Sequence, residues 1–223
     1  MTNSALEQGI GYTFRDPALL ELALTHRSLA RELGSAHNQR LEFLGDAVLG
    51  MLIAQMLYAL YPDANEGDLS KRLVSLVNGN QLAAIAEEMG IATHLQLSNS
   101  EEEQGGRSNP SNMEDACEAL LGAVYLDGGI DAARALVERF WMPYAVKLTA
   151  APKDAKTALQ EWAQGRGLPL PEYVLISAEG PAHAPDFVIE VQVQGCAPQR
   201  ANAGNKRVAE RLAAEEVLKR LPK

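Results

Sequence analysis

Residues 38–49 read NQRLEFLGDAVL and place two carboxylates, Glu42 and Asp46, four positions apart in an apolar-rich stretch that continues to residue 60. In an α-helix this spacing puts both side chains on one face, one turn apart. Residues 114–120, EDACEAL, repeat the arrangement with Asp115 and Glu118 three positions apart. Both stretches therefore predict helices that carry acidic pairs beside apolar residues.

Four carboxylates that face one another between packed helices repel unless they are protonated or neutralised. A hard divalent cation with oxygen ligands is the natural neutraliser, and Mg²⁺ is the default choice. Such a cation lowers the pKa of water and supplies a nucleophile for phosphodiester cleavage without a catalytic His, Cys or Ser. The alternative is that the acids form solvated helix faces or pair with Arg40 and Arg72. Two such pairs inside mostly apolar helices favour the metal site.

The first two thirds of the chain read as amphipathic helices. Apolar residues recur at helical spacing over residues 17–143, and turn signals such as Asn78-Gly79-Asn80 and Asp127-Gly128-Gly129 separate the segments. Residues 101–106 are typical of a solvated loop. The periodicity lapses in the segment LTAAP, which indicates a linker. We expect an all-α domain over residues 1–147 and a linker over 148–153.

The pattern changes after the linker. Asp154 is a suitable N-cap for a helix over 155–164. Residues 173–178 and 187–194 are typical of β-strands, and in the second of these runs apolar and polar residues alternate. A third strand near 199–203 and a helix over 206–221 complete the pattern. The order α-β-β-β-α predicts a small α+β domain over residues 154–223.

Charge is distributed unevenly between these two parts. The 223 residues are 47% hydrophobic and 22% charged, an ordinary globular composition that excludes a wholly disordered chain. The formal net charge of −9 argues against a nucleic-acid partner only if it is spread evenly. Residues 1–150 hold 10 basic and 20 acidic residues, whereas residues 151–223 hold 10 basic and 9 acidic ones. The acidity therefore belongs to the helical domain.

The cysteine spacing and the hydropathy of the chain indicate its cellular compartment. Cys117 and Cys196 lie far apart and form neither a disulfide framework nor a zinc-ligand spacing. The first ten residues contain no apolar core of signal-peptide length, and no stretch approaches the ~18 uncharged apolar residues of a membrane span. We expect a cytoplasmic protein without a membrane partner.

The motifs closely resemble those of a known family. NQRLEFLGDAVL resembles the signature of the ribonuclease III family, and residues 114–129, EDACEALLGAVYLDGG, resemble its second acidic motif. THRS at 25–28 and EGDLSKRL at 66–73 are similar to its lesser motifs. KTALQEWAQ (156–164), GPAHAP (180–185) and NKRVAERLAAEEVLKRL (205–221) resemble the double-stranded-RNA-binding domain of bacterial members. The resemblance implies an all-α endonuclease domain followed by an RNA-binding α+β domain.

The resemblance also implies an activity and its residues. It implies Mg²⁺-dependent cleavage of both strands of double-stranded RNA to 5′-phosphate and 3′-hydroxyl ends, with Mn²⁺ as a substitute cation and ribosomal RNA precursors and some mRNAs as substrates. Glu42, Asp115 and Glu118 match the family's metal ligands, and Asp46 and Glu118 match its catalytic positions. Gln39 departs from the common signature, which has Glu there. We therefore assign no metal-binding role to Gln39.

Partners follow from the same resemblance. One carboxylate cluster serves one scissile bond, so a homodimer with twofold symmetry supplies two clusters for two strands. The matching positions are Phe43 for the dimer interface, Gln160, Glu161 and His183 for the RNA minor groove, and Asn205, Lys206 and Arg207 for phosphates at a helix start. The rival hypothesis is a non-cleaving regulator that binds double-stranded RNA on the same fold. Its expected signature is the loss of a central acid, and all four are present.

Overall fold

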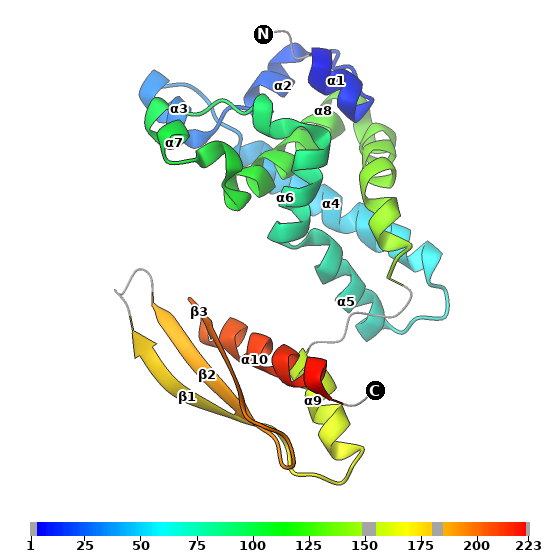
Figure 1. Ribbon diagram of the computed structural model, residues 1–223. Helices are drawn as coiled ribbons and strands as arrows, with labels where there is room; N and C mark the ends of the chain where they lie inside the picture. Colours follow the sequence, from blue (N-terminus) through cyan, green and yellow to red (C-terminus); the bar gives the residue numbers. More distant parts are fainter. Residues whose placement is uncertain (1–3, 149–154, 180–184, 222–223) are drawn as a thin grey trace. The chain divides into compact units, whose positions relative to one another are not determined.

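The computed structural model describes residues 4–148, 155–179 and 185–221, and the chain divides into two compact units, Met1–Pro152 and Lys153–Lys223 (Figure 1). Each unit contains its own cluster of buried apolar side chains. Among the described residues the first unit is helical and the second combines two helices with an antiparallel sheet. The predicted all-α domain followed by a small α+β domain is confirmed. Of the linker predicted over 148–153, only Leu148 lies within the described residues.

Helices of very different length build the first unit. They are α1 (Ser4–Ile10), α2 (Pro17–Ala23), α3 (Arg27–Leu33), α4 (Gln39–Leu60), α5 (Glu66–Val77), α6 (Gly79–Met89), α7 (Asn99–Glu103) and α8 (Pro110–Ala145), with 3-10 turns at Ile91–Thr93 and Gly106–Ser108. The turn predicted at 127–129 is a break within α8, where Gly129 has a φ of 78°. Residues 102–105 are exposed, as the solvated loop predicted at 101–106 requires, but residues 101–103 belong to the short helix α7, which Ser98 caps by accepting from the Glu101 N–H.

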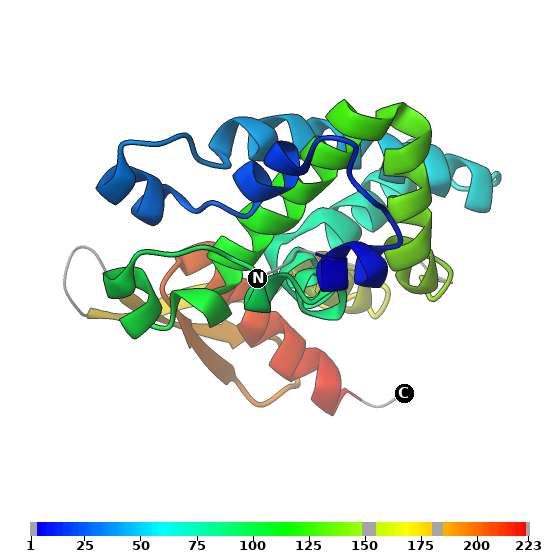
Figure 2. The ribbon, with the colours of Figure 1, turned by 90° about the horizontal axis from the view of Figure 1, so that it is seen from above.

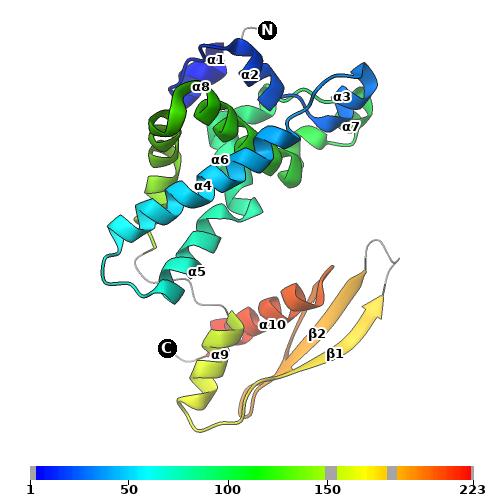
Figure 3. The same ribbon diagram turned by 180° about the vertical axis from the view of Figure 1, so that it is seen from behind.

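The centre of this unit is the packing of α4 against α8, which Figure 1 and Figure 3 show from opposite sides. Two glycines allow it. A Cβ on Gly45 would lie 1.8 Å from the carbonyl oxygen of Glu118, and a Cβ on Gly122 would lie 2.3 Å from that of Leu41. No larger residue fits either position without moving a helix backbone. This close approach brings the two acidic segments of the sequence opposite each other.

The apolar character of α4 is explained mainly by this packing. The expectation that no stretch approaches a membrane span is wrong for α4, which within the described residues is the one helix long and apolar enough to cross a membrane by length and composition. Its side chains Leu49, Leu52, Ile53 and Leu57 are buried in the core of the helical unit. The core helix of a globular protein passes the same test, so the helix gives no indication of a membrane partner.

Short helices and turns close one end of the unit around the acidic segments. Figure 2 shows α3 and α7 at the same end. The backbone of Thr25 pairs with that of Gln96, and the Ser98 N–H donates to Ser28 Oγ at 3.1 Å. The Asn38 N–H donates to the Thr25 carbonyl oxygen at 3.0 Å, which fixes the start of α4. Hydrogen bonds of the THRS motif therefore hold residues 96–98 and Asn38 together at the beginning of α4.

The second unit packs two helices on one face of a sheet. Its elements are α9 (Ala155–Gln164), β1 (Glu172–Glu179), β2 (Asp186–Gln192), β3 (Gln199–Ala203) and α10 (Lys206–Arg220). The strands pair antiparallel in the order β1-β2-β3, with Leu175 opposite Ile189 and Ile189 opposite Ala201. Alternate residues of β2, Ile189 and Val191, are buried under the helices. The third strand predicted near 199–203 is confirmed.

Candidate functional site

The four predicted carboxylates lie on the two packed helices. Glu42 and Asp46 project from α4 beside Gly45, and Asp115 and Glu118 project from α8. Their charges interact across the helix contact: burial and then the charges of Asp46, Glu114, Glu42 and Asp115 raise the pKa of Glu118 to about 8. The structure therefore brings together the acids that the sequence placed on separate helices.

Glu42 and Asp115 are, like Glu118, destabilised as anions. Burial, followed by the charge of Asp115, raises the pKa of Glu42. Burial also raises the pKa of Asp115, although the nearby charge of Arg27 opposes this shift. Glu42 Oε2 is buried, and no described residue donates a hydrogen bond to it. A carboxylate oxygen in this condition requires a proton or a cation.

The donor chemistry of the cluster fits a hard, hydrated cation. Its oxygen-only ligands and the unpartnered oxygen of Glu42 are typical of Mg²⁺ sites. Within the residues that the structure describes, no three His, Cys, Asp or Glu side chains already form a ligand shell. Mg²⁺ binds few protein carboxylates directly and keeps several waters, so a preformed protein cage is not required. Glu42, Asp115 and Glu118 are the residues that would hold such a cation.

Glu114 is a further acid that the sequence analysis did not assign. A Cβ on Gly79 would lie 2.4 Å from Glu114 Oε2, which places this carboxylate at the N-terminus of α6. The positive end of the helix dipole favours an anion there. Burial and then the charge of Asp115 nevertheless raise the pKa of Glu114. In the sequence, only its position directly before Asp115 indicated that Glu114 could belong to the site. The end of α6 lies beside it because of tertiary packing.

His26 of the THRS motif is also beside the cluster. The ring is 3% exposed, and its Nδ1 accepts from the Ser28 N–H at 3.2 Å and lies 2.8 Å from Ser28 Oγ. Burial lowers the pKa of His26. An accepting Nδ1 assigns the proton of the neutral ring to Nε2. Nε2 is buried without a described partner, and Asp115 is among the acids whose charge reaches the ring.

Phe43 lies on α4 next to Glu42 but points into solvent. It is 81% exposed, and Met51 and Tyr58 on the same helix are exposed as well. Residues seven or eight apart share a helix face, so these three form one apolar stripe. This exposure shows that Phe43 is not a core residue of the single chain.

Two of the predicted RNA contacts of the second unit line the same depression. Gln160 of α9 and Arg207 of α10 line one depression of about 510 Å³. The other residues of its lining are Lys156, Thr157, Val208 and Arg211. Asn205 caps α10 by accepting from the Arg207 N–H at 2.8 Å, and Lys206 and Glu161 are exposed. His183 lies outside the described residues.

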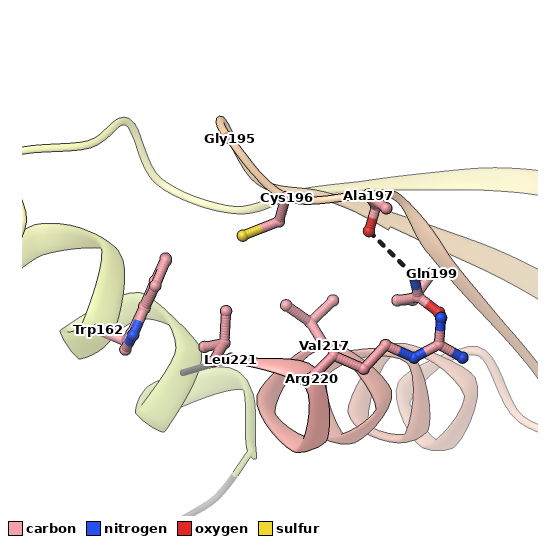
Figure 4. Close-up of a pocket in the computed structure, with 8 residues that line it drawn as sticks. All are labelled: Trp162, Gly195, Cys196, Ala197, Gln199, Val217, Arg220 and Leu221. Atoms are coloured by element: carbon pink, nitrogen blue, oxygen red, sulfur yellow. Dashed lines mark hydrogen bonds between the residues drawn. The ribbon is translucent and has the colours of Figure 1, made fainter. Parts of the chain in front are cut away.

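A different depression, of about 370 Å³, contains none of the predicted RNA contacts (Figure 4). Its lining residues are Trp162, Gly195, Cys196, Ala197, Gln199, Val217, Arg220 and Leu221. Trp162 packs against the buried cluster of this unit. This contact gives Trp162 a packing role.

Comparisons with known proteins agree with the site. The family model described as Ribonuclease-III-like matches residues 16–145, and the double-stranded RNA binding motif matches residues 155–221. Ribonuclease 3 of Phenylobacterium zucineum is 47% identical over 215 residues, which cover 96% of this chain and 90% of the relative. Ribonuclease 3 of Cereibacter sphaeroides is 47% identical over 217 residues, which cover 97% and 94%.

Solved structures give the same result for the helical unit. The nuclease domain of ribonuclease III from Campylobacter jejuni superposes with a TM-score of 0.61 at 39% identity, covering 65% of this chain and 97% of that domain. A second structure of that domain, with the same TM-score, concerns structural flexibility in its region involved in dimer formation. The chain therefore belongs to the ribonuclease III family of double-strand-specific endoribonucleases.

Proposed function

We propose that this endoribonuclease depends on Mg²⁺, with Mn²⁺ as a substitute, and cuts both strands of an RNA duplex to 5′-phosphate and 3′-hydroxyl ends. The observation that carries the proposal is the carboxylate cluster between α4 and α8, where the pKa of Glu118 rises to about 8 and Glu42 Oε2 has no described partner. Mutual repulsion of this kind costs stability unless a cation compensates it. The cost is retained because the cluster serves catalysis.

The four acids have overlapping roles in this proposal. Glu42, Asp115 and Glu118 hold the cation, and Asp46 and Glu118 act on the reacting groups. When bound, the cation supplies charge neutralisation and an acidified water as nucleophile. Asp46 is exposed at the mouth of the cluster, where it can reach the scissile phosphate and its waters. The helix contact at Gly45 keeps both acidic pairs at a fixed separation.

Cleavage of two strands requires two such clusters, and we propose a homodimer that provides them. The exposed stripe of Phe43, Met51 and Tyr58 on α4 is apolar and begins beside the carboxylates. An interface there would bury these side chains and relate the two clusters by a twofold axis. Light scattering should give the mass of two chains.

The second unit captures the duplex in this proposal. Gln160, Glu161 and His183 contact 2′-hydroxyls and base edges in the minor groove, which is the wide and accessible groove of A-form RNA. Asn205, Lys206 and Arg207 contact phosphates at the start of α10, where the helix dipole also favours an anion. We further propose a cytoplasmic location and a role in processing ribosomal RNA precursors and some mRNAs.

A cleavage assay tests the activity directly. The purified protein is incubated with a long perfect RNA duplex in Mg²⁺, in Mn²⁺ and in EDTA. We expect cutting with either cation and none in EDTA, and product 5′ ends that a 5′-phosphate-dependent exonuclease degrades. Binding without cutting in both cations would instead support the non-cleaving regulator.

A further inference from the structure

A cationic pocket lies beside the carboxylate cluster and has no part in the site described above. It has a volume of about 330 Å³ and is formed by α3, the connection from α3 to α4 and the first residue of α4. Its lining consists of Arg27, Ala30, Arg31, Ser35, His37 and Gln39. We refer to it as the α3 pocket. Its polar groups are two guanidinium groups, an imidazole, a hydroxyl and an amide, and its lining includes no carboxylate.

The two arginines of the α3 pocket have no directly bonded acidic partner among the described residues. Both side chains are exposed, and among the described residues neither forms an ion pair or a side-chain hydrogen bond. Most other arginines of the helical unit have such partners: Arg107 pairs with Glu102, and Arg134 pairs with Asp131. Two neighbouring guanidinium groups with free donors form an anion site, because their planar forks match the oxygens of a phosphate.

The α3 pocket borders the carboxylate cluster. The charge of Arg27 reaches Glu42 and Asp115 and opposes the rise in the pKa of both. Gln39 begins α4 and precedes Glu42 by three residues, so the two side chains share a helix face. An anion in the pocket would therefore lie next to a phosphate held at the carboxylates.

We propose that the α3 pocket binds a phosphodiester of the RNA strand being cut, adjacent to the scissile phosphate. The proposal rests on the proposed function and adds a subsite to it. Arg27 and Arg31 supply the charge, and the Gln39 amide N–H and Ser35 hydroxyl supply neutral donors. His37 adds an imidazole whose Nδ1 is buried without a described partner.

The proposal also explains why a neutral residue at position 39 suits this chain. A carboxylate there would lie against Arg27 and Arg31 and would compete with phosphate for both guanidinium groups. The amide leaves the positive charge of the pocket available. Gln39 is thus a binding residue for the RNA backbone in this proposal.

The main alternative is that the arginines only offset the charge of the carboxylates. This explanation applies to Arg27, whose charge opposes the rise in the pKa of Glu42 and Asp115. It does not apply to Arg31, whose charge is not among those that shift these acids. Arg31 is exposed, so its replacement should leave the fold intact, and the test is made there.

The test compares Arg31→Gln with wild type and with Arg134→Gln, which removes a charge already paired with Asp131. Duplex binding is measured against salt concentration in Ca²⁺ as a probe cation, and steady-state cleavage is measured in Mg²⁺. For Arg31→Gln we expect the salt slope of log K to fall by about one, since one phosphate contact is lost. We expect KM to rise about threefold to tenfold while kcat changes by less than about twofold, because a uniform binding contact is removed.

Gln39→Glu and inorganic phosphate complete the test. Gln39→Glu should raise KM in the same direction as Arg31→Gln, and Arg134→Gln should behave as wild type. If the pocket takes only free phosphate, Arg31→Gln will abolish inhibition by inorganic phosphate but leave the salt slope for RNA unchanged, and the proposal is wrong. The proposal would also be wrong if Arg31→Gln left both the salt slope and KM unchanged and inorganic phosphate did not inhibit wild type. Absence of cleavage by wild type would instead reject the proposed function, and the salt slopes would still decide whether the pocket contacts RNA.

Discussion

The carboxylate cluster of the helical unit and the start of α10 in the second unit differ in how each would deal with phosphate. The cluster is acidic and partly buried, and burial together with the charges of neighbouring acids raises the pKa of Glu42 and Glu118. Lys206 and Arg207 are basic and exposed, on a unit with nearly balanced charge. In the proposed function, the first approaches phosphate only through a cation, whereas the second binds it directly. A net charge summed over the chain conceals both properties, and the local distribution determines what each unit can bind.

Of the variants that test this comparison, Glu118→Gln should have the largest effect, which is on cleavage. The amide keeps the size of the side chain but removes a charge from the cluster, so cleavage should fall by more than the roughly 10–100-fold typical of outer-shell groups. Duplex binding should stay within about twofold of wild type, as measured by filter binding in Ca²⁺. Cleavage at the wild-type rate would show that Glu118 is not in the catalytic site.

The double variant Lys206→Ala/Arg207→Ala should weaken capture. Losing two phosphate contacts should lower the salt slope of log K by about two and reduce affinity by roughly tenfold or more near physiological salt. The matched control is Lys219→Ala/Arg220→Ala at the other end of α10, where both side chains are exposed. Equal effects of the two double variants would indicate a general charge effect and no specific contact.

Gly45→Ala should separate α4 from α8. The added Cβ would lie 1.8 Å from a backbone oxygen of α8, so a helix must shift, at a cost of about 2–3 kcal/mol in the free energy of unfolding. Gly50→Ala on the same helix meets no atom within 4 Å and should stabilise the helix by roughly 0.5–1 kcal/mol. Urea unfolding measures both, and similar effects at the two positions would contradict the close-contact explanation.

The pH dependence of stability should show the smallest effect. Burial, and then the charge of Asp46, raises the pKa of Glu118 from 4.5 to about 8, so the folded state holds this proton between those pH values while the unfolded state has released it. Without a cation, stability should therefore fall as pH rises from about 4.5 to 8. At pH 8 in EDTA, Glu118→Gln should be more stable than wild type by roughly 1–2 kcal/mol, because partial exposure screens the full shift. An identical pH slope in both proteins would contradict this assignment.

Local pattern was sufficient for much of the fold. Apolar spacing and turn residues indicated the helices of the first unit, and the Asp127-Gly128-Gly129 signal corresponds to the break at Gly129 in α8. The acidic pairs were visible because charged residues in apolar helices are costly. Short α7 was missed, since five residues carry no periodicity and its start depends on the cap by Ser98.

The features that sequence could not supply depend on tertiary contacts. Glu114 meets the N-terminus of α6, which is 35 residues earlier in the chain, and only packing brings them together. The unpartnered Nε2 of His26 is recognised only from its burial and from the hydrogen bonds at Nδ1. The α3 pocket likewise joins side chains from α3 and the start of α4, whose relative position the sequence motif does not give.

The most direct test of the central claim measures binding and cleavage of one RNA duplex by Glu118→Gln and by Lys206→Ala/Arg207→Ala at the same salt and Mg²⁺ concentrations. The account predicts that the first variant binds the duplex as wild type does but does not cut it. The second should bind weakly and, at saturating RNA, cut at a rate within about threefold of wild type, because binding and chemistry are separate. If both variants lose binding and cleavage together, catalysis and capture are not divided between the two units.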